Sequence, residues 1–270
     1  MPHPFNPTSL CLPDLFVTSL SLLFLFSSTT KPHKNLFLKI PNNFPRCCCR
    51  PFLKIPNMPP TKSRFPTPQS LTNWLKPRLP QDSFSSWGNK PGTKNIHNLF
   101  LEISEGESIL TDTTPPIRNL HVITVKIISK SNSNCVLIEA FQELSDGTRR
   151  ERFRPLSEKM KPNESVENAV LRAVKEELGS VITSEDDGNV KIVEGSYVEK
   201  VEERGSVSYP GLPACYVLHC VEACVDGLPS EDFWTEEGNE YGECSEGDIV
   251  EKAVFVKKHF WKWVGVNSLN

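Results

Sequence analysis

Two adjacent carboxylates, Glu176 and Glu177, are the residues of this chain that point most directly to chemistry. They end a segment with helical periodicity, and the partial negative charge at a helix C-terminus disfavours each acid by roughly 0.3–1 kcal/mol. Arg172 lies one turn before Glu176, but an exposed pair at this spacing returns only about 0.3–0.5 kcal/mol. A divalent cation would correct the charge, because hard cations prefer carboxylate oxygens. The pair therefore indicates a cation site, with ordinary surface charge on a helix as the alternative.

The element that must position these acids lies within residues 158–181, which read as a loop, an amphipathic helix and a glycine stop. Ser165 is suited to cap the helix, and Glu167 falls in the first turn, where the dipole favours an anion. Gly179 is expected to end the helix in the left-handed conformation. Apolar residues four apart give the helix one buried stripe: Val166, Val170, Val174 and Leu178.

The spacing resembles the Nudix box, G-x5-E-x7-R-E-U-x-E-E-x-G-U, in which U is a bulky aliphatic residue. Six positions match the pattern: Glu164, Arg172, Val174, Glu176, Glu177 and Gly179. Three positions depart from it, since Glu158 replaces the first Gly, Ala173 replaces a Glu, and Ser180 replaces the last aliphatic residue. By element order the resemblance covers roughly residues 118–265, although only the box carries specific identity.

The resemblance implies an α/β fold, a Nudix-like α/β/α sandwich with a mixed β-sheet. It also implies hydrolysis of a small-molecule diphosphate, such as a nucleoside-diphosphate-linked compound, with Mg2+ or Mn2+ as the cofactor. In that family pattern Glu176 and Glu177 are catalytic metal ligands, Arg172 orients carboxylates, and Glu164 is a supporting acid. A further acid is expected from a loop outside the box, with three candidates: Glu236, Glu237 and Glu240.

Ala173 leaves two functions open, because alanine cannot ligate a metal where the pattern has a carboxylate. The chain is then either an altered but active hydrolase or a catalytically inactive module that binds a ligand or a protein. We expect Glu177→Gln to abolish turnover in the first case and to leave ligand binding intact in the second.

Residues 149–154 place four arginines within six positions. Strand alternation puts Arg150, Arg152 and Arg154 on one face. One interpretation is a solvated edge strand that is protected from aggregation by its charge. The other is a clamp for phosphates or a carboxylate, because guanidinium groups match both.

The remaining pattern predicts mostly strands around the box helix. Residues 120–128 and 135–141 are expected to form an antiparallel hairpin. Further strands are expected at 98–104, 190–201 with a bulge at Gly195, 214–225 and 253–256, and a terminal helix at 259–264.

Composition divides the chain into a leader at 1–67, a lead-in at 68–117 and a main domain at 118–265. The leader is rich in Pro, Ser, Thr and Phe and nearly free of acids, which is typical of an organellar transit peptide. We expect a chloroplast location, with the mitochondrion, a secretory signal, or the cytosol after a start at Met58 as alternatives. Residues 100–270 hold 18 Lys and Arg against 31 Asp and Glu, a net charge of −13 that argues against nucleic-acid binding. The longest apolar run of the leader, 15–26, is short for a membrane span, and the sequence leaves the oligomeric state open.

Overall fold

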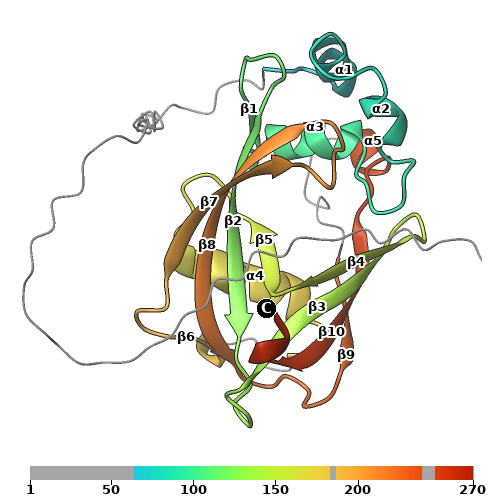
Figure 1. Ribbon diagram of the computed structural model, residues 1–270. Helices are drawn as coiled ribbons and strands as arrows, with labels where there is room; N and C mark the ends of the chain where they lie inside the picture. Colours follow the sequence, from blue (N-terminus) through green and yellow to red (C-terminus); the bar gives the residue numbers. More distant parts are fainter. Residues whose placement is uncertain (1–63, 183–186, 239–246, 270) are drawn as a thin grey trace, which may run out of the picture. The chain divides into compact units, whose positions relative to one another are not determined.

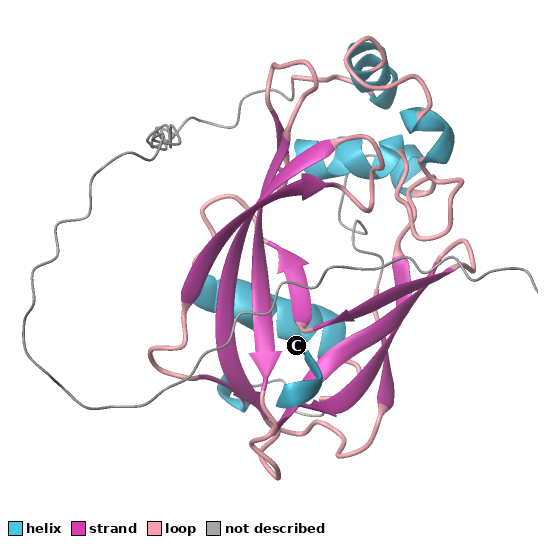
Figure 2. Cartoon of the chain, viewed as in Figure 1, coloured by secondary structure: helices cyan, strands magenta, loops and turns pink. Residues whose placement is uncertain are grey.

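The computed structural model describes residues 64–182, 187–238 and 247–269 (Figure 1). Almost all of the expected leader and the candidate acid Glu240 lie outside these residues. Two sheets and one long helix, α4 (Val166–Leu178), form the main part of the described chain, as Figure 2 shows. The α/β class with a mixed sheet that the sequence predicts is confirmed.

The first sheet has six strands in the order β1-β2-β8-β6, with β5 on β2 and β7 on β8. β2 and β8 run parallel, and all other pairs in this sheet are antiparallel. Its strands are β1 (Ile109–Leu110), β2 (Arg118–Ile127), β5 (Leu156–Lys159), β6 (Val190–Ile192), β7 (Val198–Gly205) and β8 (Pro213–Val225).

The second sheet is antiparallel throughout, in the order β4-β3-β10-β9. Its strands are β3 (Cys135–Leu144), β4 (Arg149–Arg154), β9 (Phe233–Glu236) and β10 (Val256–Gly265). One hydrophobic core joins helix α4 to both sheets, because Val170 and Ala173 of the helix share it with Val125 of β2 and Trp261 of β10.

Helix α4 begins as predicted, since the Ser165 side chain accepts the backbone N–H of Asn168. Its end differs from the prediction. Gly179 has a φ of −59°, in the right-handed region. A Cβ atom at this position would collide with the carbonyl oxygen of Lys175. Glycine is therefore needed for close approach of the backbone, and the expected left-handed conformation was wrong.

The predicted hairpin between residues 120–128 and 135–141 is also wrong, although both segments are strands. β2 and β3 belong to different sheets, and they are linked by the bridge Ile128–Val136 and a hydrogen bond from the Ser129 N–H to the Cys135 carbonyl. Both edges of β2 are occupied, by β8 on one side and by β1 and β5 on the other. Partners distant in sequence therefore replace the local pairing.

Four other segments differ from the sequence-based expectation, and one of them is the strand expected at 253–256, of which only Val256 lies in a strand. Residues 98–104 fall in a helix, α3 (Ile96–Ser104), because Asn95 caps it and its apolar residues are buried consecutively. Residues 259–264 belong to β10 rather than to a terminal helix, since that strand pairs with both β3 and β9. The strand expected at 190–201 is divided into β6 and β7 by a turn in which Gly195 has a φ of +74°.

The lead-in forms helices α1 (Pro68–Leu75), α2 (Ser83–Ser86) and α3. Their apolar residues share a second core with Tyr209 and Leu212, from the turn before β8. Short helices complete the described chain: η1 (Asp187–Asn189), α5 (Gly247–Val250) and η2 (Val266–Leu269). None of the helices in the described residues is long and apolar enough to cross a membrane.

Candidate active site

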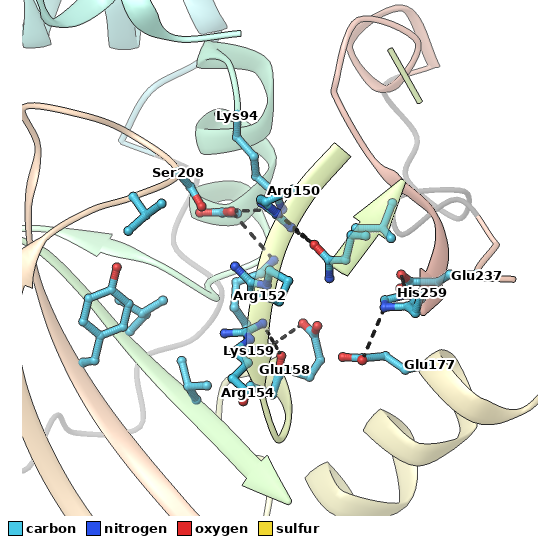
Figure 3. A pocket seen from close by; sticks show the side chains of 18 of the residues that line it. Lys94, Arg150, Arg152, Arg154, Glu158, Lys159, Glu177, Ser208, Glu237 and His259 are labelled. Atoms are coloured by element: carbon cyan, nitrogen blue, oxygen red, sulfur yellow. Dashed lines mark hydrogen bonds and ion pairs between the residues drawn. The ribbon is translucent and has the colours of Figure 1, made fainter. Parts of the chain in front are cut away.

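A cavity of about 350 Å3 lies beside the C-terminal end of helix α4 (Figure 3). Its lining includes three of the four arginines of β4, together with Glu158 and Lys159 of β5 and Glu177 of α4. On another side it is lined by Leu120 and Val122 of β2 and Tyr216 of β8. Seven Lys and Arg and five Glu line the cavity, so it suits an anionic ligand that also carries a less polar part.

The spacing of the box residues produces a compact ion network outside the cavity lining. Arg172 donates to both carboxylate oxygens of Glu164, at 2.7 and 2.9 Å. The same guanidinium donates to Glu176 at 2.8 Å and to the carbonyl oxygen of Lys159 at 2.7 Å. Arg172 therefore links the start and end of the box helix to β5, the orienting role that the resemblance implies.

This network shifts the pKa values of its members. Burial alone would raise the pKa of Glu164, but hydrogen bonds from Arg172 and from the Lys161 backbone outweigh burial and lower it. The pKa of Arg172 is raised despite its burial, because Glu164, Glu176 and Glu158 stabilise the charged form. Glu176 itself is 39% exposed on its side chain and does not line the cavity.

Glu177 is placed quite differently from its neighbour Glu176. Its side chain is 4% exposed and lines the cavity. Its Oε2 atom is buried and has no hydrogen-bond partner. Burial, and then the nearby carboxylates Glu139, Glu158 and Glu237, raise the pKa of Glu177 well above its usual value, while the charge of His259 acts in the opposite direction. A buried acceptor without a partner costs roughly 1–3 kcal/mol or more, so this position requires an explanation.

His259 of β10 lies between two carboxylates. Its Nδ1 atom is 2.6 Å from Glu139 Oε1, and its Nε2 atom is 2.8 Å from Glu237 Oε2. The Nδ1 atom is also 3.7 Å from Glu177 Oε2. Both ring nitrogens face carboxylate oxygens, an arrangement that favours the doubly protonated imidazole when no metal is bound. Burial alone would lower the pKa of His259, but these hydrogen bonds and carboxylate charges raise it well above its usual value.

Glu139 of β3 is the buried centre of this group, with no exposed side-chain surface. Burial would raise its pKa, but the hydrogen bond and charge of His259, followed by the charges of Arg154 and Arg150, lower it. Arg152 donates to Glu139 Oε2 at 3.3 Å, and the Nε atom of Arg154 lies 3.6 Å from the same oxygen. Glu139 therefore connects the arginine strand to His259.

Three of the four arginines of β4 line the cavity, namely Arg150, Arg152 and Arg154, whereas Arg149 is exposed and pairs with Glu151. Arg150 is 9% exposed and donates to the side chain of Gln142. The alternation that the sequence predicts is present, with a register irregularity near Phe153, whose φ is +44°. These positions favour the ligand-clamp interpretation of the three arginines over a solvated edge strand.

The lead-in contributes to the same cavity, which the sequence did not predict. Lys94 and Glu102 both line it. Glu102 is 1% exposed and accepts hydrogen bonds from Arg118 at 2.6 Å and from the Tyr209 hydroxyl at 3.1 Å. Because these partners come from the main domain, α3 fixes one end of the cavity.

The three loop acids proposed from the sequence have different positions. Glu237 lines the cavity and contacts His259. Glu236 is exposed and pairs with Lys258 at 3.1 Å. Glu240 lies outside the described residues.

Sequence reasoning missed Glu139 and His259. A charged residue within the apolar run at 135–141 was the available signal for Glu139, since a buried acid needs a partner. His259 was missed because residues 259–264 were assigned to a helix.

A divalent cation fits the donors at this site. Glu139, Glu177 and His259 each offer one ligand atom, and these atoms lie within 4.8 Å of one another. The unpartnered Oε2 atom of Glu177 is the independent sign of a missing partner. Such a cation would supply charge neutralisation and an activated water molecule when bound.

Comparison with known proteins places Nudix hydrolases among the structural neighbours. No family model matches the sequence, and no curated protein matches it. A NUDIX hydrolase from Nitrosomonas europaea has 16% identity and a TM-score of 0.26, over 41% of this chain and 62% of the neighbour. The ORF135 protein of E. coli has 22% identity and a TM-score of 0.25, over 39% and 61%. The Ap4A hydrolase of C. elegans has 15% identity and a TM-score of 0.27, over 55% and 81%.

The chain spans about three fifths of the length of the first two of these structures. The specific resemblance to the Nudix hydrolases lies in the residues of the box. Because the TM-scores are low, we infer the function from the residues of the site.

Proposed function

We propose that this chain is a metal-dependent hydrolase of the Nudix type that cleaves a nucleoside-diphosphate-linked or related diphosphate compound. The observation that carries the proposal is the buried, unpartnered carboxylate oxygen of Glu177 beside a cavity lined with arginines. Phosphoryl transfer to water needs positioning and neutralisation of charge more than covalent chemistry from the protein. The proposed cofactor is Mg2+ or Mn2+, held at Glu177.

The side chains around the cavity have distinct roles in this proposal. Arg150, Arg152 and Arg154 bind the phosphate oxygens, because guanidinium groups donate paired hydrogen bonds to phosphate. The wall that contains Leu120 and Tyr216 receives the less polar part of the substrate. Arg172 holds the box helix and β5 in register through Glu164 and the Lys159 carbonyl, so it acts as a positioning residue.

The second candidate is a module that binds a diphosphate compound without cleaving it. Ala173 is completely buried, and Glu176 is hydrogen-bonded to Arg172 away from the cavity lining. Of the acids that the box pattern expects within its helix, Glu177 is therefore the one that lines the cavity. The small number of metal ligands on the box helix favours binding without turnover. The cavity-lining arginines Arg150, Arg152 and Arg154 support both candidates.

Turnover on a panel of diphosphate compounds separates the two candidates. The full chain is purified free of metal and incubated with Mg2+ or Mn2+ and nucleotide diphosphate compounds, including Ap4A. Products are followed by mass spectrometry beside Glu177→Gln. Metal-dependent turnover that the variant loses supports the hydrolase. A folded protein that retains a panel compound without cleaving it, with or without the substitution, supports the binding module instead.

We also propose an organellar location, with the chloroplast preferred, on the composition of residues 1–67. A fluorescent protein fused behind these residues should enter the organelle. A fusion that starts at Met58 should stay in the cytosol. Equal distribution of the two fusions would contradict the proposal.

A further inference from the structure

The box helix does not present enough ligands to the cavity to hold a cation by itself. Ala173 has no donor atom, and the Glu176 carboxylate is bound by Arg172 at 2.8 Å. Glu177 supplies one carboxylate to the cavity. One carboxylate fills only a small part of the coordination shell of Mg2+ or Mn2+, so tight binding in the absence of substrate needs further donors from other elements.

The second sheet supplies such donors. Glu139 of β3 and His259 of β10 are both buried, and these two strands are hydrogen-bonded neighbours. The side chains approach Glu177 closely enough for one ion, since the three ligand atoms lie within 4.8 Å of one another. Figure 3 shows His259 and Glu177 facing one another from β10 and α4. The donors therefore come from two rigid strands and the end of one helix.

The surroundings of these donors resemble the support that metal ligands usually need. A ligating histidine commonly donates its second ring N–H to a carboxylate, which fixes the orientation of the ring. Glu237 Oε2 lies 2.8 Å from His259 Nε2 and can accept that hydrogen bond when Nδ1 faces the ion. Arg152 holds the other oxygen of Glu139 at 3.3 Å. Each sheet donor thus has a charged partner besides Glu177.

We propose that Glu139, Glu177 and His259 form a relocated metal site, in which the sheet replaces the ligands that the box helix lacks. The inference rests on the proposed metal-dependent function and names the residues that hold its ion. One imidazole nitrogen with two carboxylates suits Mn2+ or another first-row transition metal, whereas Mg2+ favours oxygen donors alone. Mn2+ is therefore expected to bind more tightly than Mg2+.

Direct metal titration tests which ligand set is used. The metal-free full chain is titrated with Mn2+, and free Mn2+ is followed by electron paramagnetic resonance, with Mg2+ as a competitor. Glu139→Gln and Glu177→Gln should each abolish tight binding, and Glu237→Gln should weaken it about 10–100-fold. Glu176→Gln is the matched comparison at the neighbouring helix position and should leave the affinity within about twofold. The reverse pattern, with binding lost in Glu176→Gln and kept in Glu139→Gln, overturns the proposal.

A spectroscopic measurement on the unsubstituted protein avoids the risk that a buried variant fails to fold. Electron spin echo modulation of bound Mn2+ should show coupling to one imidazole 14N nucleus. Labelling the protein with 15N-histidine should change that modulation. Bound Mn2+ without nitrogen coupling, or no tight binding of Mn2+ at all, overturns the relocated site.

Failure of the metal site and failure of the proposed hydrolase give different results. Tight Mn2+ binding that depends on Glu139, together with no turnover on any compound, supports the site and contradicts the hydrolase. Metal-dependent turnover that survives Glu139→Gln supports the hydrolase and overturns the site.

Discussion

Two carboxylate networks adjoin helix α4, and they differ in how each acid is satisfied. In the box network, Arg172 donates to Glu164 and Glu176, and the Glu176 side chain is 39% exposed. In the sheet network, Glu139 and His259 are buried, and Glu177 adds a buried oxygen that has no hydrogen-bond partner, with His259 Nδ1 3.7 Å away. In the box network, both carboxylates accept hydrogen bonds from Arg172. The sheet network thus holds a buried acid whose hydrogen bonding is incomplete, which is a property expected of a functional site.

The largest expected difference between the networks is in the cost of removing an acid. Glu139→Leu leaves His259, Arg152 and Arg154 without their common buried partner, and breaking a buried pair in this way costs about 3–5 kcal/mol. Glu176→Leu removes an exposed partner of Arg172 and should cost no more than about 1 kcal/mol. Urea unfolding of both variants, with chelator present, measures the two free energies of unfolding. Similar losses of unfolding free energy in the two variants would contradict the expected difference between the two networks.

A smaller effect of opposite sign is expected at Glu177. A buried polar atom without a partner costs about 1–3 kcal/mol, so Glu177→Met should stabilise the metal-free protein by a similar amount. The same substitution should remove metal binding and turnover, because it deletes the ligand. Urea unfolding in chelator gives the stability.

Glu177→Gln is the matched control, since it keeps the shape and the polar atoms and should gain less stability than Glu177→Met. A large loss of stability in Glu177→Met would mean that its carboxylate already has a strong stabilising partner within the protein.

The contact of Arg172 with Glu176 could be predicted because both residues lie on one helix, whereas the Lys159 carbonyl reaches Arg172 from β5. Helical spacing alone brings Arg172 beside Glu176, and the capping residue Ser165 sets where the helix begins. The common face of Arg150, Arg152 and Arg154 on β4 could also be predicted, because strand alternation is a local property. In each case the contact depends on neighbours fewer than about ten residues apart.

The sheet network could not be predicted from local patterns, because its members are far apart in the sequence. Glu139 and His259 meet only through the pairing of β3 with β10, and the sequence pointed to a hairpin between β2 and β3 instead. In β10, Val256 is buried before a register irregularity, and His259 and Trp261 are buried after it with the two-residue period of a strand. This pattern also argues for a strand where we expected a helix. Pairing of distant strands therefore decides which donors lie beside Glu177.

The smallest expected effect is a pH dependence of stability from the box network. The pKa of Glu164 is lower in the folded protein than the ordinary value of about 4.3, because Arg172 and the Lys161 backbone hold the charged form. Its contribution is therefore complete above that ordinary value and is lost as the pH falls through the folded-state pKa. Because Glu164 is partly solvated, the contribution should be about 1 kcal/mol or less.

Glu164→Gln should accordingly lose stability near neutral pH and show a smaller decline than the unsubstituted protein on acidification. Urea unfolding across the acidic range gives both slopes, and the difference between them isolates this one carboxylate. Parallel slopes would show that Arg172 does not depend on the charge of Glu164. The box network would then be held by the contacts of Arg172 with the Lys159 carbonyl and Glu176. Its contribution to the free energy of unfolding would not depend on the protonation of Glu164.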